Sequence, residues 1–295
     1  MKKTFVGIAV LCMIGLLGCS NVLDGSTGTK TGAEDPADLA RVLIPLPKTG
    51  ARNIEEAQTN TNLFEAIFYR YGTDGSKYVG TYNATATPAD EYLEISLAVG
   101  TYDVLVLVGD QYSSQEYFSG YNYSEDGVYY AYPVLLASGS AEEQTVSAGE
   151  NTITITLLSV DYSLGIPSTV DIGSTYEVSV QYTLRNSFLW NRAYYLETYL
   201  YSTNDSGNST SLYNQSVYYG DTDREGVKTK QNAAPITTGT RAIRGYTYFS
   251  SNLYSLKSWR LFDSSHPTYG NRIPSITFVD AELPSLKLAV TWGDE

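Results

Sequence analysis

Hydrophobic and polar residues alternate along most of this chain, in short runs separated by glycine, proline and aspartate. In three segments every second residue is apolar, so the apolar side chains share one face of an extended chain; these segments are 92–97, 151–158 and 176–184. This period of two is typical of β-strands with one buried and one exposed face. Residues 102–108 read YDVLVLV and are apolar on both faces, which predicts a central strand that is covered on both sides. The alternation therefore predicts a protein built mainly from strands.

Turn residues divide these runs into strands of ordinary length. The pair Asp74-Gly75 lies between two β-rich runs, 63–71 and 77–82, and Asp-Gly is a strong hairpin signal. Only residues 54–60 suggest a helical turn. Many short strands with Gly and Pro between them favour β-sandwiches. Further strands are expected at 42–44, 194–201, 245–249, 276–279 and 286–292.

The start of the chain follows a different pattern, that of an export signal. Two lysines precede an apolar run over residues 5–17, which is shorter than the roughly 20 residues of a membrane span. The Leu-Leu-Gly-Cys at 16–19 resembles the lipobox of bacterial lipoproteins, in which the chain is cut before a cysteine that is then lipidated. The resemblance implies a signal peptide at 1–18 and a lipid on Cys19. A plain cleavable signal or a short membrane anchor is the alternative.

The segment after the cysteine has the composition of a tether. Residues 20–38 are rich in Gly, Ser, Thr and Asp and lack apolar periodicity, so residues 19–38 are expected to hold the lipidated cysteine and a flexible spacer. Ser20 favours release toward the outer membrane, as the sorting pattern of such lipoproteins implies. The expected location is the cell envelope, with the protein lipid-anchored in the outer membrane on its periplasmic face or at the cell surface.

The remaining chain is long enough for two domains. A turn-rich stretch at 161–169 separates two sets of expected strands, which predicts one domain at 39–160 and a second at 161–295. Residues 97–106 read LAVGTYDVLV and resemble the L-x-x-G-x-Y-x-V-x-V strand pair of prealbumin-like (transthyretin-like) and related immunoglobulin-like bacterial domains. Residues 147–152 resemble the turn before their last strand. The predicted fold is all-β, with two β-sandwich domains in tandem after a flexible tether.

The charge and the cysteine content bear on nucleic-acid binding and on disulfide formation. The chain has 19 Lys and Arg against 32 Asp and Glu, a net charge of −13. Loss of the two signal lysines leaves 17 against 32, or −15, and such a field disfavours binding to nucleic acid. Of the two cysteines, Cys12 lies in the signal and Cys19 carries the lipid, so no disulfide is expected.

Residues suited to catalysis are scarce. His266 is the only histidine, and it lies in a Ser/Pro-rich loop, FDSSHPTYG, where we expect it to be exposed. No serine sits in a G-x-S-x-G elbow, and P-loop and G-x-G-x-x-G patterns are absent. A hydrolase that uses two carboxylates, as glycosidases do, stays open as an alternative. The sequence favours a protein that is not an enzyme and needs no cofactor.

One acidic stretch has the composition of a metal-binding loop. Asp221, Asp223 and Glu225 belong to D-T-D-R-E-G, which approaches the D-x-D-x-x-G opening of a calcium loop. An EF-hand loop has a bidentate Glu at its twelfth position, where this chain has Asn232. Ca²⁺ binding is therefore one interpretation, and a solvated acidic turn is the other.

Aromatic residues gather in one segment. The chain holds 27 tyrosines, and residues 110–133 contain eight Tyr or Phe among Ser, Gly and Asn. This mixture resembles antibody paratopes, and sugars also pack their C–H faces on such rings. We expect an exposed recognition loop; the alternative is one or two ordinary strands with half-buried tyrosines. The candidate binding residues are Tyr112, Tyr117, Phe118, Tyr121, Tyr123, Tyr129 and Tyr130.

Three classes of function fit this sequence. The first is a non-catalytic cell-envelope lipoprotein, a surface or periplasmic binding or adhesion module that recognises a glycan or a protein through Tyr-rich loops. The second is a structural component of an envelope or surface assembly, and the third is a carboxylate-based, glycosidase-like hydrolase. An exposed aromatic cluster favours the first, a free flat strand edge the second, and a deep pocket with two close acids the third.

Overall fold

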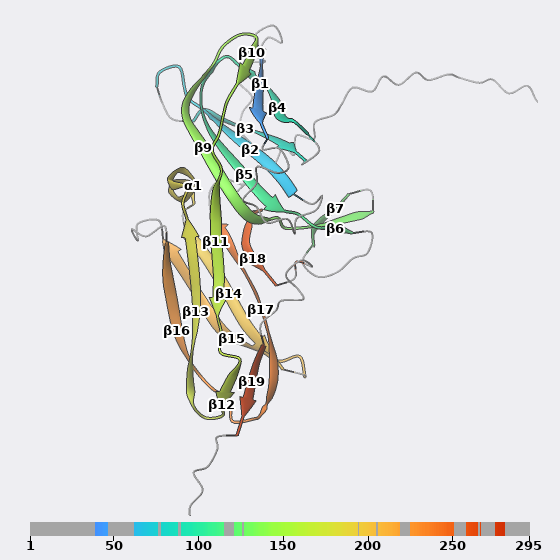
Figure 1. Cartoon of the computed structure of the whole chain (residues 1–295), viewed down its shortest axis with the longest axis vertical. Coiled ribbons are helices and arrows are strands. Elements are labelled where there is room, and N and C mark those ends of the chain that lie inside the picture. The colour runs from blue at the N-terminus through green and yellow to red at the C-terminus, as the bar shows by residue number, and fades with distance from the viewer. Residues whose placement is uncertain are drawn as a thin grey trace, which may run out of the picture. The chain divides into compact units, whose positions relative to one another are not determined.

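The protein, described here from a computed structural model, is built almost entirely of β-strands (Figure 1). This confirms the all-β fold class. All described residues lie within the compact unit Pro36–Glu295. The described residues are 39–46, 62–75, 78–87, 90–114, 121–125, 127–193, 195–204, 206–218, 225–250, 258–264, 266 and 275–280.

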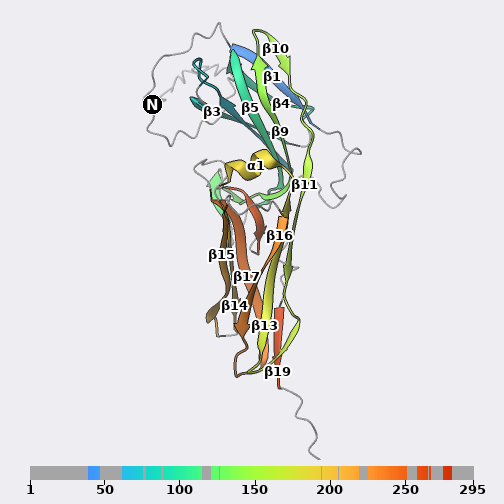
Figure 2. The ribbon, with the colours of Figure 1, turned by 90° about the vertical axis from the view of Figure 1, so that its left-hand side faces the viewer.

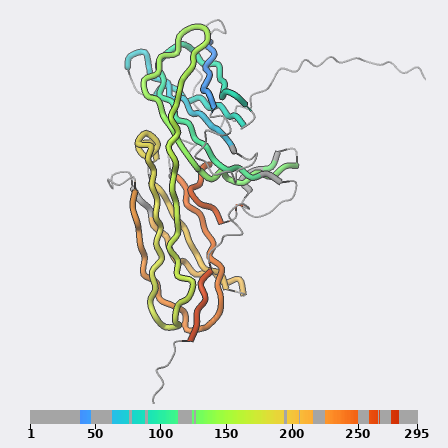
Figure 3. Tube along the Cα trace, in the orientation of Figure 1, coloured from blue at the N-terminus to red at the C-terminus, as the bar shows by residue number. Residues whose placement is uncertain are grey.

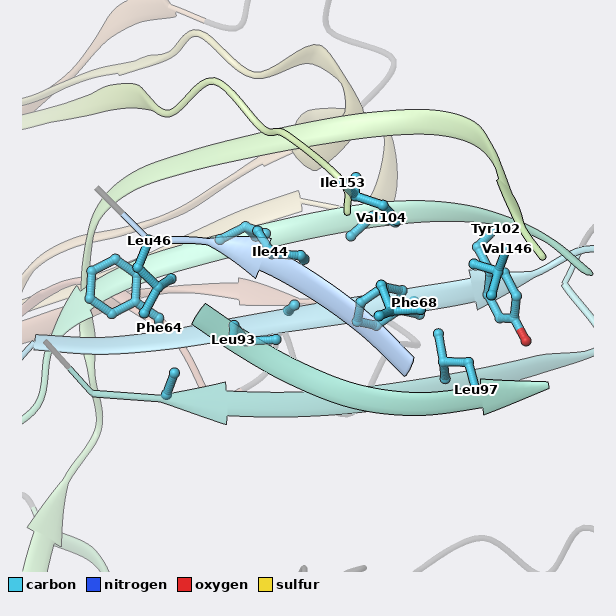
Figure 4. Close-up of a cluster of buried hydrophobic side chains, with 14 of the residues drawn as sticks. Ile44, Leu46, Phe64, Phe68, Leu93, Leu97, Tyr102, Val104, Val146 and Ile153 are labelled. Atoms are coloured by element: carbon cyan, nitrogen blue, oxygen red, sulfur yellow. The ribbon is translucent and has the colours of Figure 1, made fainter. Parts of the chain in front are cut away.

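The first half of the chain forms two layers of strands around one hydrophobic core. One layer consists, in spatial order, of β10 (Glu150–Thr152), β1 (Leu39–Pro45) and β4 (Tyr92–Ala98). The other consists of β3 (Gly80–Ala86), β2 (Asn62–Arg70), β5 (Gly100–Asp110) and β9 (Val134–Val146), all paired antiparallel. Figure 4 shows Phe64, Phe68 and Leu93 between the layers, where all three are fully buried.

The central strand predicted at 102–108 is confirmed as the inner part of β5. Every residue of β5 from Tyr102 to its end is buried. Its two faces belong to different cores: Val104 and Val106 pack in the first sandwich, while Leu105 and Leu107 pack in a core shared with the second half of the chain. Burial on both faces explains the continuous apolar run.

Two turns expected from the sequence are present. Strands β2 and β3 form the predicted hairpin, in which Gly75 has a positive φ of 78° and donates from its N–H to the carbonyl of Gly72 at 3.0 Å. The motif at 97–106 connects β4 to β5, which lie in different layers. The Tyr102 hydroxyl donates to the Ala98 carbonyl at 2.7 Å, so this tyrosine fastens the crossing between layers.

The second half of the chain repeats the two-layer arrangement. One layer consists of β11 (Leu158–Gly165), β13 (Thr175–Leu184) and β16 (Glu225–Ala233). The other consists of β15 (Ser209–Tyr218), β14 (Tyr195–Thr203), β17 (Gly239–Ser250), β19 (Ser275–Val279) and β12 (Thr169–Asp171). Val178, Leu200, Ile243 and Phe278 are among the residues of its core. Burial alternates residue by residue along β13, as its sequence predicts.

A third core joins the two halves. The short helix α1 (Ser187–Arg192) begins after Asn186, whose side chain accepts hydrogen bonds from the first helical N–H groups. Its Phe188, Leu189 and Trp190 are buried in a cluster that also contains Ile67 of β2. Figure 2 shows α1 beside the strands of the first sandwich.

Strand pairing also crosses from one half to the other. Strand β11 pairs antiparallel with both β9 and β13. Strand β18 (Arg260–Asp263) pairs with β17 and meets β9 where Arg260 lies beside Val134. The turn-rich stretch 161–169 therefore begins inside a strand that both halves share. The division into domains at 39–160 and 161–295 stays a prediction.

Several sequence predictions fall outside the described residues. They concern the signal peptide at 1–18, the tether at 19–38, the helical turn at 54–60 and the strand at 286–292. In the part of the chain that is described, no helix has the length and apolar character needed to cross a membrane.

Candidate functional site

The described part of the tyrosine-rich segment 110–133 lies mostly in a small sheet. Strands β6 (Ser113–Ser114), β8 (Val128–Ala131) and β7 (Tyr121–Glu125) lie in that order and pair antiparallel. Figure 3 traces the chain from β5 out into this segment and back into β9. Tyr112, Tyr129 and Tyr130 are half-buried. The described part is thus strand with half-buried rings rather than an irregular loop.

Several predicted site residues cannot be placed. Cys19, Tyr117, Phe118, Asp221 and Asp223 lie outside the described residues. The backbones of Tyr121 and Tyr123 belong to β7, and their side chains are outside the described part. Glu225 opens β16 and is exposed. Among the described residues no three His, Cys, Asp or Glu side chains come together as a metal site, so calcium binding at 221–225 stays a prediction.

A second group of tyrosines lies on the outer surface of β14 and β17. Residues alternate in both strands, so Leu196, Leu200 and Ile243 point into the cores while the residues between them point outward. Antiparallel pairing then sets the outward side chains opposite one another in three rungs. These rungs are Glu197–Tyr248, Tyr199–Tyr246 and Tyr201–Arg244. We call the six rung residues, together with Arg260 and Tyr132, the tyrosine face.

The rings of the tyrosine face contact one another. The Tyr199 ring centroid lies 5.4 Å from that of Tyr246 and 6.4 Å from that of Tyr248, and the latter pair is stacked with 11° between planes. The hydroxyls of Tyr199 and Tyr248 donate to the two carboxylate oxygens of Glu197. One carboxylate therefore holds two rings in place. Tyr246 is 38% exposed and Tyr201 is 37% exposed, so the face is open to solvent.

Arg260 connects this face to the predicted tyrosine-rich segment. Its guanidinium carbon lies 3.8 Å from the ring centroid of Tyr132 and 5.3 Å from that of Tyr248. Burial lowers the Arg260 pKa, and the neighbouring Tyr132 and Asp263 oppose that effect. A cation held between rings at these distances stabilises their arrangement. One residue of segment 110–133 thus belongs to the same surface as the tyrosines of β14 and β17.

The sequence contains a local signal for this face. Residues 194–201 and 245–249 are predicted strands, and each carries a tyrosine at every second position in part of its length. Alternate tyrosines on two strands share a face once the strands are paired. The alternation does not specify which strands pair or in which register.

The expectation of an exposed His266 is wrong. His266 is 1% exposed, and its ring meets that of Tyr112 edge-on with centroids 6.2 Å apart. Asp110 and Asp263 nearby are also buried. Burial lowers the His266 pKa, although both carboxylates oppose the shift. The His266 ring packs against the start of the tyrosine-rich segment, so this imidazole is enclosed rather than presented to a substrate.

A buried carboxylate network lies at the junction of the two halves. Asp103 is 1% exposed and accepts hydrogen bonds from the hydroxyls of Tyr71 and Tyr78 and from the N–H of Glu143. The guanidinium of Arg192, at the end of α1, lies 3.6 Å from the Asp103 carboxylate. These contacts account for both carboxylate oxygens and tie α1 to β5 and β9. The network is therefore best explained as a structural connection.

Glu65 is a carboxyl group whose pKa lies well above its ordinary value. Burial raises its pKa to about 7, while hydrogen bonds from Trp259 Nε1 at 2.6 Å and Asn83 Nδ2 at 3.1 Å oppose the change. Trp259 is fully buried in the core between the halves. A catalytic pair requires a second acid facing the first, and among its described hydrogen-bond partners Glu65 has only these two neutral donors. We assign Glu65 to the packing of the junction.

Comparisons with known proteins do not identify a function for this chain. No family model matches the sequence, and no curated protein matches it. Among solved structures, the chain is similar to one titled "Crystal structure of calcium binding domain CBD12 of CALX1.1", with a TM-score of 0.24 and 8% identity. The match covers 77% of this chain and 90% of that chain. A TM-score this low supports no inference about function.

Proposed function

We propose that this protein is a non-catalytic binding module of the bacterial cell envelope, and that the tyrosine face binds a glycan. The observation that carries the proposal is the group of three contacting rings, Tyr199, Tyr246 and Tyr248, on the outer surface of a sheet. Tyr246 is 38% exposed, and Tyr199 and Tyr248 are half-buried. An aromatic cluster that reaches the surface in this way is typical of a binding site. A binding role accounts for this exposure.

The chemistry of the face suits sugars. Pyranose rings present C–H groups that pack on aromatic rings, and their hydroxyls accept and donate hydrogen bonds. Tyrosine supplies both a flat apolar ring and a polar tip. Glu197 adds acceptor oxygens, and Arg244 adds donors at the exposed end. Because Glu197 already orients two rings, little side-chain freedom is left to lose on binding.

The lipid anchor places this binding surface at a membrane. In the proposal, Cys19 carries the lipid and residues 20–38 form a flexible spacer. The root-mean-square reach of such a spacer is about 5–6 Å times the square root of its length. A reach on that scale holds the folded body near the outer membrane while leaving its outer faces free. Tethered binding would retain a glycan or a glycan-coated partner at the envelope.

An array of immobilised glycans tests the proposal. We expect the full-length protein to bind a subset of glycans, and Tyr246→Ala to lower that affinity about tenfold, or about 1.4 kcal/mol. The matched control is Tyr92→Ala, because Tyr92 is a 45%-exposed tyrosine on β4 of the other sandwich. Equal binding by all three proteins, or no glycan bound by the wild type, contradicts the proposal.

A further inference from the structure

The three rungs of the tyrosine face form a line rather than a patch. They lie at successive outward positions of β14, namely Glu197, Tyr199 and Tyr201. Outward residues in a strand are two positions apart, and each position advances about 3.4 Å, so neighbouring rungs are about 7 Å apart. The full line therefore measures about 14 Å along the strands. A single pyranose ring is shorter than this line.

The exposure of the rungs increases along the line. The first rung, Glu197–Tyr248, is half-buried, and its carboxylate accepts two tyrosine hydroxyls. At the third rung Tyr201 is 37% exposed and Arg244 is also exposed. The first two rungs are fixed by the contacts among their rings, whereas the third offers an open ring and a guanidinium. A ligand that reaches the third rung gains a separate set of contacts.

Ligands that lie on a sheet face are contacted from one side. Each sugar unit then gains only a modest free energy, and affinity accumulates with the number of units in contact. Aromatic contacts contribute about 0.5–1.5 kcal/mol each beyond area burial. A monosaccharide on one rung would leave two rungs uncovered.

We propose that the tyrosine face is a linear site with several subsites, whose ligand is an extended oligosaccharide of at least three sugar units aligned with β14 and β17. This inference rests on the proposed glycan binding and adds the form of the ligand. Tyr199 and Tyr246 form the middle subsite, and Tyr201 with Arg244 forms an end subsite.

Affinity as a function of chain length tests this inference. The probes are cello-, xylo-, malto- and chito-oligosaccharides, each from monosaccharide to hexasaccharide, titrated calorimetrically into the full-length protein. We expect affinity within the bound series to rise at least tenfold from the disaccharide to the trisaccharide. Tyr201→Ala should remove most of that rise while leaving disaccharide binding within twofold of the wild type. Tyr246→Ala should weaken every length.

The outcomes separate the inference from the function on which it rests. If a sugar binds and Tyr246→Ala weakens it, but affinity is already maximal for the mono- or disaccharide, the linear site is wrong and glycan binding stands. Equal losses at all lengths in Tyr201→Ala also contradict the end subsite. If no sugar binds, or Tyr246→Ala has no effect, both proposals fail. Tyr92→Ala and circular dichroism of each variant control for folding.

Discussion

Replacement of Glu65 by glutamine tests the structure of the junction between the halves. Glu65 on β2 accepts a 2.6 Å hydrogen bond from the indole N–H of Trp259, which comes from the far end of the chain and is fully buried. Burial raises the Glu65 pKa to about 7 from an ordinary value of 4.5. Glutamine keeps the shape and an acceptor for the indole but carries no charge. The substitution therefore isolates the free-energy cost of a charge at this partly buried position.

The size of this effect follows from the pKa. Below pH 4.5 the carboxyl is protonated in both the folded and unfolded chains, so its ionisation costs nothing. As the pH rises from 4.5 to about 7, the unfolded chain loses the proton first, and the free energy of unfolding falls. A change of roughly 2.5 pH units at 1.36 kcal/mol each gives an upper bound of about 3 kcal/mol. Above pH 7 the cost is constant.

Urea unfolding at pH 4.5 and pH 8 measures this effect. We expect Glu65→Gln to be more stable than the wild type at pH 8 by up to about 3 kcal/mol, with the advantage vanishing toward pH 4.5. Glu91→Gln is the control, because it makes the same substitution at an exposed position. If the difference between wild type and Glu65→Gln is the same at both pH values, the Glu65 pKa is not raised as described.

Two further predictions concern stability and anchoring. Asp103→Ala should lower the free energy of unfolding by about 3–5 kcal/mol in urea titrations, because it removes the buried partner of the Arg192 charge. The control, Asp161→Ala, breaks an exposed ion pair with Arg185 and should lower the free energy of unfolding by less than about 1 kcal/mol. Equal losses in the two variants would refute the structural role of Asp103. Cys19→Ser should abolish incorporation of labelled fatty acid in cells, and persistent labelling would show that the lipobox interpretation is wrong.

The strands could be predicted from the sequence because their signals are local. Alternation at 176–184 and the apolar run at 102–108 reflect which side chains meet a core, and both appear in the structure as predicted. The Asp74-Gly75 hairpin depends on a backbone conformation that glycine adopts readily, and it too is confirmed. These features depend on residues close together in the chain.

The tyrosine face could not be predicted because it depends on register between distant strands. Tyr199 meets Tyr246 only because β14 pairs with β17 in one particular alignment, and a shift of one residue would turn the rings inward. Arg260 meets Tyr132 because β18 lies beside β9. The burial of His266 has the same origin, since its ring packs against Tyr112, which lies more than a hundred positions earlier in the chain. A sequence pattern within one strand does not predict contacts between distant strands.

Protection of tyrosines from chemical nitration tests the central claim most directly. The full-length protein is treated with tetranitromethane, with and without the oligosaccharide that binds it most tightly, and nitrated tyrosines are located by mass spectrometry. Tyr201, Tyr246 and Tyr92 are 37%, 38% and 45% exposed, so all three should react in the free protein. We predict that the sugar protects Tyr201 and Tyr246 and leaves Tyr92 reactive. Unchanged nitration of Tyr201 and Tyr246 in the saturated complex would contradict the assignment of the tyrosine face as the binding site.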